Sequence, residues 1–199
     1  MRGFLARTAE AGDFTWPYGI DPKLSLPGNR LLTSVKIANR RVFKIGESRD
    51  DYSGLGTTVV AALIDDGQVS LTGVGDSRIY AFSDGRLEQL TADDSWASTV
   101  AASGATASPQ MRHVLTNAVG ARENIDVEVT ERPFDAGVTL LLCSDGLHGA
   151  LDEAALATQL ASPAPVATIA TELVRLALER DGRDNITALV LRWSQDAAS

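Results

Sequence analysis

The sequence predicts an α+β fold in which antiparallel strands are covered by helices. Short β-rich runs in the first half of the chain are separated by Asp66-Gly67 and Asp84-Gly85. An Asp-Gly pair between two apolar runs is typical of a two-residue hairpin, so the strands on either side are expected to be antiparallel. Longer stretches with a helical apolar period flank these runs, which predicts helices packed outside a sheet.

The chain is expected to open with an irregular arm. Residues 1–28 mix Gly, Pro and aromatic residues and keep no sustained period. From Asn29 onward, apolar residues recur at spacings of four and three, namely Leu31, Val35, Ala38, Val42 and Ile45. This pattern predicts a helix that Asn29 caps, that ends at Gly46, and that lies on a sheet.

The remaining elements follow the same two periods. Strands are expected at residues 57–64, 69–74, 78–82 and 87–90, as one antiparallel meander, and at 126–132, 138–143 and 186–193. Helices are expected at residues 93–103, 152–160 and 166–180. The sequence shows no internal repeat and no linker, which predicts a single domain at residues 29–194 and a tail at 195–199.

Composition excludes several classes of protein. The chain has 199 residues and a formal net charge of −8, and no run of Lys or Arg forms a basic patch, so nucleic acid is not an expected partner. No apolar run approaches the roughly 20 residues that cross a bilayer, and the N-terminus has no apolar leader core, which predicts a soluble cytoplasmic protein. Cys143 is the only cysteine and is expected to be a packed thiol, without a disulfide or thiolate metal cluster.

Three aspartates stand at the ends of predicted strands. Asp145 directly follows an apolar strand, Asp184 comes just before the last strand, and Asp76 lies in Gly73-Val-Gly-Asp-Ser-Arg78. Taken alone, each has an ordinary interpretation as a turn or helix-capping residue. Taken together, they favour a carboxylate cluster for a hard divalent cation, Mg²⁺ or Mn²⁺ rather than zinc.

Six short blocks then resemble, in order, the signature blocks of the protein phosphatase 2C (PPM) family of metal-dependent serine/threonine phosphatases, in its bacterial form. They are Gly54-Leu-Gly-Thr-Thr-Val-Val60, Val74-Gly-Asp-Ser-Arg78, Leu90-Thr-Ala-Asp-Asp-Ser95, Leu115-Thr-Asn-Ala-Val-Gly120, Leu142-Cys-Ser-Asp-Gly-Leu147 and Arg183-Asp-Asn-Ile-Thr187. The resemblance covers residues 29 to about 193.

The resemblance implies an αββα sandwich of two antiparallel sheets flanked by helices, with a dinuclear Mg²⁺ or Mn²⁺ centre. It implies that Asp145 and Asp184 ligate the metal pair and that Asp76 helps to hold a third ion. A metal-activated water would hydrolyse phosphoserine and phosphothreonine, so no protein nucleophile is needed. The expected partners are phosphoprotein substrates, opposed by Ser/Thr kinases in signalling, and the residues that bind substrate are not indicated.

The family's opening motifs are not found. An Asn-x-Asp block and an Asp-Gly-x-Gly-Gly block, which complete the metal site, do not occur before Gly54, so the fold is expected to be N-terminally incomplete. Two functions remain open at this stage. One is a phosphatase, with the activity of this chain by itself in doubt. The other is a non-catalytic binding or regulatory module that keeps the fold.

Other polar residues receive structural interpretations. His113 and His148 are expected to be a structural and a surface histidine, and Arg78 is expected to pair with a carboxylate. Gly149, not Arg, stands six positions after Cys143, which excludes a cysteine-phosphatase loop.

Overall fold

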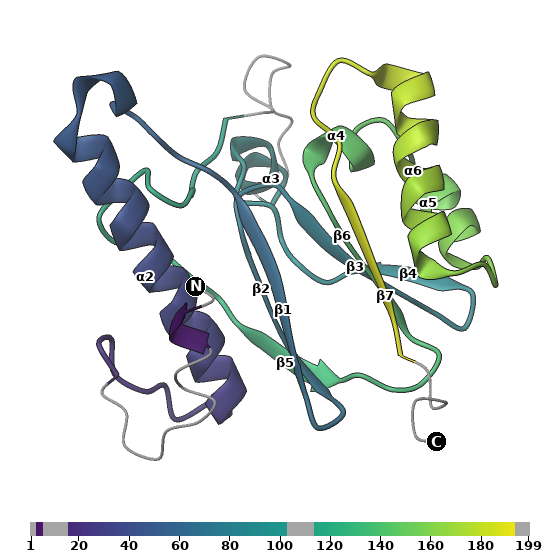
Figure 1. Cartoon of the computed structure of the whole chain (residues 1–199), viewed down its shortest axis with the longest axis horizontal. Coiled ribbons are helices and arrows are strands. Elements are labelled where there is room, and N and C mark those ends of the chain that lie inside the picture. The colour runs from purple at the N-terminus through teal and green to yellow at the C-terminus, as the bar shows by residue number, and fades with distance from the viewer. Residues whose placement is uncertain (1–2, 6–15, 103–113, 194–199) are drawn as a thin grey trace. The chain divides into compact units, whose positions relative to one another are not determined.

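The computed structural model describes residues 3–5, 16–102 and 114–193, and the chain divides into two compact units (Figure 1). The first unit comprises Met1–Asp76 and Asp93–Arg132, and the second comprises Ser77–Ala92 and Pro133–Ser199. His113 lies outside the described residues. In the part that the structure covers, no helix has both the length and the apolar content needed to cross a membrane.

Helix α2 (Leu26–Ser48) is the long helix of the first unit. Ser25 caps it, since its Oγ accepts a hydrogen bond of 3.2 Å from the Gly28 amide. The prediction that Asn29 caps this helix is wrong, and the helix begins inside the predicted arm. Asn29 is buried in the first turn, where its Nδ2 donates to the carbonyls of Asp21, Leu24 and Ser25 and so ties the preceding segment to the helix.

The sheet of the first unit has the order β1-β2-β5, with β1 at Val59–Asp65, β2 at Gln68–Val74 and β5 at Thr130–Pro133. Asp66 and Gly67 both have positive φ, 44° and 71°, as the two central residues of a type I′ hairpin turn require. The unit also contains the 3₁₀ turn η1 (Asp50–Tyr52) and helix α3 (Trp96–Ala102). Helix α2 packs on β1 and β2, and Val35 shares a buried cluster with Val74, Val119 and Ile125.

The sheet of the second unit has the order β4-β3-β6-β7 and is antiparallel throughout. Its strands are β3 (Arg78–Ser83), β4 (Arg86–Gln89), β6 (Thr139–Cys143) and β7 (Ala188–Arg192). Every residue of β6 is buried, including Cys143, which is packed in the core as predicted.

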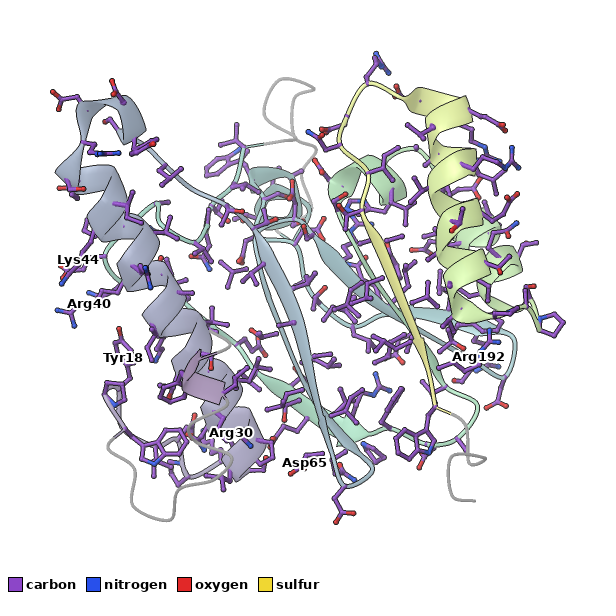
Figure 2. All side chains as sticks on the ribbon, viewed as in Figure 1. Tyr18, Arg30, Arg40, Lys44, Asp65 and Arg192 are labelled. Carbon is purple, nitrogen blue, oxygen red and sulfur yellow. The ribbon has the colours of Figure 1, made fainter. Side chains whose placement is uncertain are left out.

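Three helices complete the second unit: α4 (Asp145–His148), α5 (Glu153–Leu160) and α6 (Val166–Asp181). Leu156 of α5 and Leu173 of α6 lie in one buried cluster with Leu141 of β6. Arg192, labelled in Figure 2, connects the layers, because its Nη2 donates bonds of 3.0 Å to the carbonyls of Leu160 and Ser162 and its Nε donates to Thr139 Oγ1.

The α+β class with two antiparallel sheets and flanking helices is confirmed, but the single meander is wrong. Both predicted Asp-Gly hairpins form, yet β1-β2 belongs to one sheet and β3-β4 to the other. The consecutive strands β2 and β3 belong to different sheets and do not pair. The predicted strand at residues 126–132 is also shorter and later than expected, at Thr130–Pro133.

Candidate metal centre

The second unit brings Asp145 and Asp184 to the same end of a strand pair. The register of β6 and β7 ends at Cys143 opposite Ala188, and the chain remains tied beyond it. Ser144 N donates to Thr187 O at 3.2 Å, Thr187 N donates to Ser144 Oγ at 3.0 Å, and Ser144 Oγ donates to Asn185 O at 3.1 Å. Asp145 therefore leaves β6 beside the segment through which Asp184 leads into β7.

Gly146 allows the two segments to come this close. A Cβ at position 146 would lie 2.4 Å from the carbonyl oxygen and 3.1 Å from the carbonyl carbon of Asn185, and both atoms belong to backbone. Real Cβ atoms do not approach backbone so closely. The glycine of the Asp145-Gly146 pair is thus required by packing against the segment that carries Asp184.

Both carboxylates retain acceptor capacity. Asp145 is half-buried and its Oδ1 accepts from the Gly146 amide at 2.9 Å, while Asp184 is exposed and its Oδ1 accepts from the Asn185 amide at 2.7 Å. Within the described ranges neither has an ion-pair partner, and the adjacent Arg183 pairs with Asp181 at 2.6 Å. An ionised carboxylate has about four acceptor positions, so most of the oxygen lone pairs at this edge remain available.

This donor set fits a hydrated hard cation. Mg²⁺ is usually held through one or two carboxylates, with waters and substrate phosphate oxygens completing the shell. No group of three or more His, Cys, Asp or Glu side chains suited to a metal is found among the residues that the structure describes. Asp145 and Asp184 are the predicted ligands on the two segments that Ser144 joins at this end of β6 and β7.

Asp76 belongs to the first unit, where it is half-buried two residues after the end of β2. Gly75 precedes it, and a Cβ there would lie 2.4 Å from Thr58 Cγ2. Asp94 holds the polar backbone groups of Gly75: the Gly75 amide donates to Asp94 Oδ2 at 3.1 Å, and the Asp94 amide donates to Gly75 O at 2.7 Å. Asp94, which lies 19 residues after Gly75 in the chain, therefore holds the backbone directly before Asp76.

The other candidate residues take structural positions. Arg78 in β3 donates from Nη1 to the Tyr80 hydroxyl at 2.8 Å. Burial raises the pKa of Tyr80, and the hydrogen bond and charge of Arg78 oppose that rise in part. His148 is half-buried in the short helix α4, next to Leu147 of the core.

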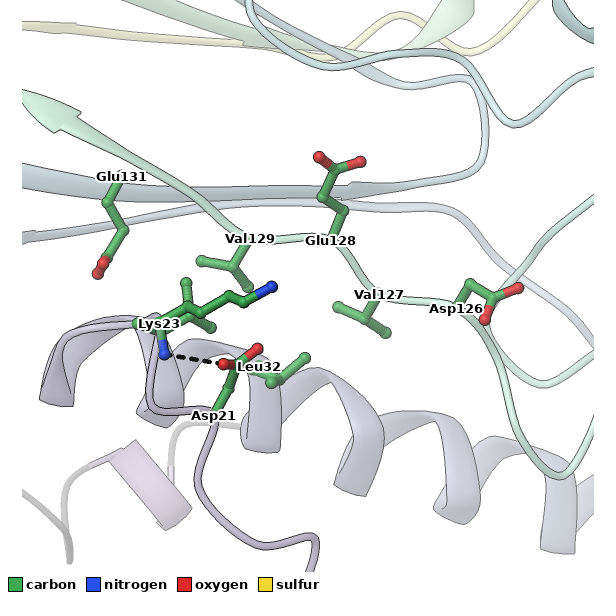
Figure 3. Close-up of a pocket in the computed structure, with 9 residues that line it drawn as sticks. Asp21, Lys23, Leu32, Asp126, Val127, Glu128, Val129 and Glu131 are labelled. Atoms are coloured by element: carbon green, nitrogen blue, oxygen red, sulfur yellow. Dashed lines mark hydrogen bonds between the residues drawn. The ribbon is translucent and has the colours of Figure 1, made fainter.

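The first unit contains a cavity of about 680 Å³ (Figure 3). Its lining residues are Asp21, Lys23, Leu24, Leu32, Asp126, Val127, Glu128, Val129 and Glu131. Hydrogen bonds from Ser25 and Ser70 already engage Glu131, and the Lys23 amide donates to Asp21 Oδ1 at 2.9 Å. None of the predicted ligands Asp76, Asp145 and Asp184 is among these lining residues.

A model of the family described as protein phosphatase 2C matches residues 27–190 of the chain. The chain belongs to the protein phosphatase 2C family. The matched range contains all six signature blocks, so the resemblance predicted from those blocks is confirmed.

Curated relatives and solved structures agree with this membership. The serine/threonine phosphatase stp of Listeria innocua is 33% identical over 166 residues, which cover 81% of this chain and 66% of the relative. The crystal structure of the Mycobacterium tuberculosis serine/threonine phosphatase PstP/Ppp superposes with a TM-score of 0.81 at 29% identity, over 97% of this chain and 79% of that one. A structure of the catalytic domain of PstP in complex with two manganese ions gives a TM-score of 0.76 at 29% identity, over 94% and 78% of the two chains.

The chain therefore spans just under two thirds of the length of the Listeria relative. Within the protein phosphatase 2C blocks, sequence reasoning missed the roles of Ser144, Asp94 and Asn117. Ser144 stands directly before the predicted ligand Asp145, and polar residues next to a predicted ligand are the signal that could have indicated it. Asp94 and Asn117 stand in two quoted blocks without a role, and their connection to Gly75 depends on the fold.

Proposed function

We propose that this chain acts as a metal-dependent protein serine/threonine phosphatase, with Asp145 and Asp184 as ligands of Mg²⁺ or Mn²⁺ and Asp76 as a ligand of a further ion. The observation that carries the proposal is the tie between Ser144 and the Asn185–Thr187 segment, which sets two unpaired carboxylates at one edge of the sheet. Family membership and the names of the relatives support the reaction class.

The cations, when bound, supply an acidified water for attack on the phosphate and positive charge for its oxygens. The chain's own contribution is to hold them. Asp145 is anchored at the first residue of α4, Gly146 lets that turn approach Asn185, and Ser144 keeps the two segments in register. No protein nucleophile is required, and the buried Cys143 thiol is not available to serve as one.

The substrates in this proposal are proteins phosphorylated on serine or threonine. The partners are the Ser/Thr kinases whose phosphorylation this chain would reverse. We assign the activity to residues 29–194 and its site of action to the cytoplasm, where thiols such as that of Cys143 are kept reduced. The relatives named serine/threonine phosphatases support the substrate class.

The test is Mn²⁺-dependent hydrolysis of p-nitrophenyl phosphate and of a phosphothreonine peptide by the purified chain. We expect activity that EDTA abolishes, and a decrease on the order of 100-fold or more in Asp145→Asn and Asp184→Asn, since even outer-shell changes cost about 10–100-fold in metal sites. Asp51→Asn, a change at an exposed carboxylate of η1, is the matched control and should keep full activity.

Two results would contradict the proposal. Hydrolysis that survives both substitutions would show that Asp145 and Asp184 do not hold the catalytic ions. A folded chain that binds Mn²⁺ or a phosphopeptide without hydrolysing it would instead indicate a binding module.

A further inference from the structure

The backbone at Gly75 determines where Asp76 begins. Gly75 has φ at +104°, and a Cβ there would collide with Thr58, so the position favours glycine. A glycine has no side chain whose contacts could hold it in place. Its position depends on what binds its amide and carbonyl. The position of Asp76, the next residue, depends in turn on the position of Gly75.

Asp94 engages both of these groups. Its carboxylate oxygen Oδ2 accepts from the Gly75 amide at 3.1 Å, and its own amide donates to the Gly75 carbonyl at 2.7 Å. A hydrogen bond to a charged acceptor is stronger than a neutral one. Asp94 thus clamps one residue from both sides, immediately before the proposed ligand Asp76.

Asp94 is itself held from the block at residues 115–120. Asn117 Nδ2 donates to Asp94 Oδ2 at 3.0 Å and to the Asp126 carbonyl at 2.8 Å, and the Thr116 amide donates to the Asp94 carbonyl at 2.8 Å. Asn117 is only 8% exposed. Three signature blocks that are distant in sequence therefore meet at the Asp94 carboxylate.

The orientation of Asn117 has a cost. Its Oδ1 is buried and has no hydrogen-bond partner among the described residues, and an unpaired buried acceptor costs about 1–3 kcal/mol unless a water satisfies it. In return, both amide hydrogens of Asn117 are hydrogen-bonded, one to Asp94 Oδ2 and the other to the Asp126 carbonyl.

Helix capping does not explain Asp94. Helix α3 begins at Trp96, and the residue that caps it is Ser95, whose Oγ accepts from the Ser98 amide at 3.2 Å. The hydrogen bonds that Asp94 Oδ2 accepts come from Gly75 and Asn117 instead. The carboxylate therefore acts on the turn before Asp76 rather than on the helix that follows it.

We propose that Asp94 is a positioning residue for Asp76. Through Gly75 it fixes the backbone that carries the Asp76 carboxylate, and Asn117 orients it for this purpose. The inference rests on the proposed function, because Asp76 needs to be preorganised only if it binds a cation. Preorganisation by residues next to a ligand commonly determines metal affinity.

The experiment compares Asp94→Ala with Asp94→Asn in the full chain. Both hydrogen bonds end on the same oxygen, so an asparagine can present its single amide oxygen there and accept both of them without a negative charge. Mn²⁺ binding is measured by titration calorimetry, and kcat is measured separately from the Mn²⁺ concentration that gives half-maximal rate. We expect Asp94→Ala to weaken, by about 10-fold, the binding of the ion that Asp76→Asn loses, and Asp94→Asn to restore most of that affinity.

A double variant separates positioning from general destabilisation. If Asp94 acts through Asp76, then Asp76→Asn combined with Asp94→Ala binds Mn²⁺ no more weakly than Asp76→Asn alone. Additive losses would overturn the proposal. Equal losses in Asp94→Ala and Asp94→Asn would also overturn it, because they would show that the charge of Asp94 binds the metal directly.

A second measurement needs neither metal nor activity. Amide hydrogen exchange at Gly75 and Asp76 of the metal-free chain should be faster in Asp94→Ala and near wild type in Asp94→Asn. Unchanged exchange and unchanged Mn²⁺ affinity in Asp94→Ala would refute the clamp while leaving the proposed phosphatase activity intact. Failure of the phosphatase proposal itself would appear in a different measurement, as a rate of hydrolysis that Asp145→Asn does not change.

Discussion

Ser144 Oγ donates a hydrogen bond of 3.1 Å to the carbonyl oxygen of Asn185 and accepts one of 3.0 Å from the amide of Thr187. One hydroxyl thereby extends the pairing of the two strands past the last residue of β6 and the first residue of β7. The chain neighbours of Ser144 and Asn185 are Asp145 and Asp184, the two proposed metal ligands of the second unit.

Ser144→Ala should weaken metal binding together with stability. The substitution leaves the Asn185 carbonyl and the Thr187 amide without this partner, which costs about 1–2 kcal/mol in the free energy of unfolding. We expect a lower midpoint in urea denaturation and a higher Mn²⁺ concentration for half-maximal hydrolysis. Ser162→Ala removes a comparable side-chain bond, to the Ala164 amide, and should change stability alone. A Mn²⁺ requirement that both variants share with the wild type would count against a role for Ser144 in the site.

Gly146→Ala should be more severe than its size suggests. Its Cβ would lie 2.4 Å from the Asn185 carbonyl oxygen, so α4 and the segment carrying Asp184 must move apart. Overpacking of this kind costs about 1–3 kcal/mol in the free energy of unfolding. We expect kcat to fall by more than this loss of stability would explain. Gly56→Ala is the control, since its Cβ would meet Val119 O at an ordinary 3.6 Å. Wild-type kcat in a folded Gly146→Ala protein would show that the close approach is unimportant for activity.

Glu131 should make stability depend on acidity. Burial acts to raise the pKa of its carboxyl, but hydrogen bonds from the Ser25 side chain and amide, from the Ser70 side chain and from the Gly28 amide outweigh this, and the net pKa is lowered. A carboxyl with a lowered folded-state pKa stabilises the protein above its unfolded pKa of about 4.3, and that contribution is lost as pH falls through the folded value.

The corresponding measurement is urea denaturation of Glu131→Gln and wild type at pH 7 and at successively lower pH. The variant should be less stable at pH 7 by about 1–2 kcal/mol, and the difference should shrink below pH about 4 as the wild-type carboxyl is protonated. Glu47→Gln, at an exposed position of α2, should show no such difference. A gap between Glu131→Gln and wild type that stays constant with pH would mean that the charge of Glu131 is not what stabilises this corner.

Arg192→Met should destabilise the second unit. The guanidinium donates to the carbonyls of Leu160, the last residue of α5, and of Ser162, two residues beyond it, and to Thr139 Oγ1 of β6, so its removal leaves several acceptors unpaired. We expect a loss of about 2–3 kcal/mol in the free energy of unfolding. Arg175→Met, which removes only exposed helix-surface ion pairs with Glu172 and Glu179, should cost clearly less, because exposed ion pairs contribute little to stability. Similar losses for the two arginines would argue that the interlayer bonds contribute little.

Sequence alone determined the features that depend on neighbouring residues. The turns at Asp66-Gly67 and Asp84-Gly85 formed as predicted because their positive φ values follow from local backbone preferences. The buried face of α6, with Ile169, Leu173 and Ala177, followed from a helical period that needs no partner to be recognised. The six signature blocks indicated the family because their residue types and their order along the chain can be recognised without knowing the fold.

The tertiary structure decided the features that depend on distant residues. Which sheet each hairpin joins was not predictable, because strand pairing is chosen by the faces that become buried rather than by the turn that links two strands. Asn29 satisfied every local criterion for a helix cap, yet Ser25 took that position and Asn29 became buried against the segment from Asp21 to Ser25. The hydrogen bonds of Ser144 to Asn185 and of Asp94 to Gly75 join positions 41 and 19 residues apart. Sequence therefore determined which carboxylates stand at strand ends, and only the folded backbone decided which of them are held together and by what.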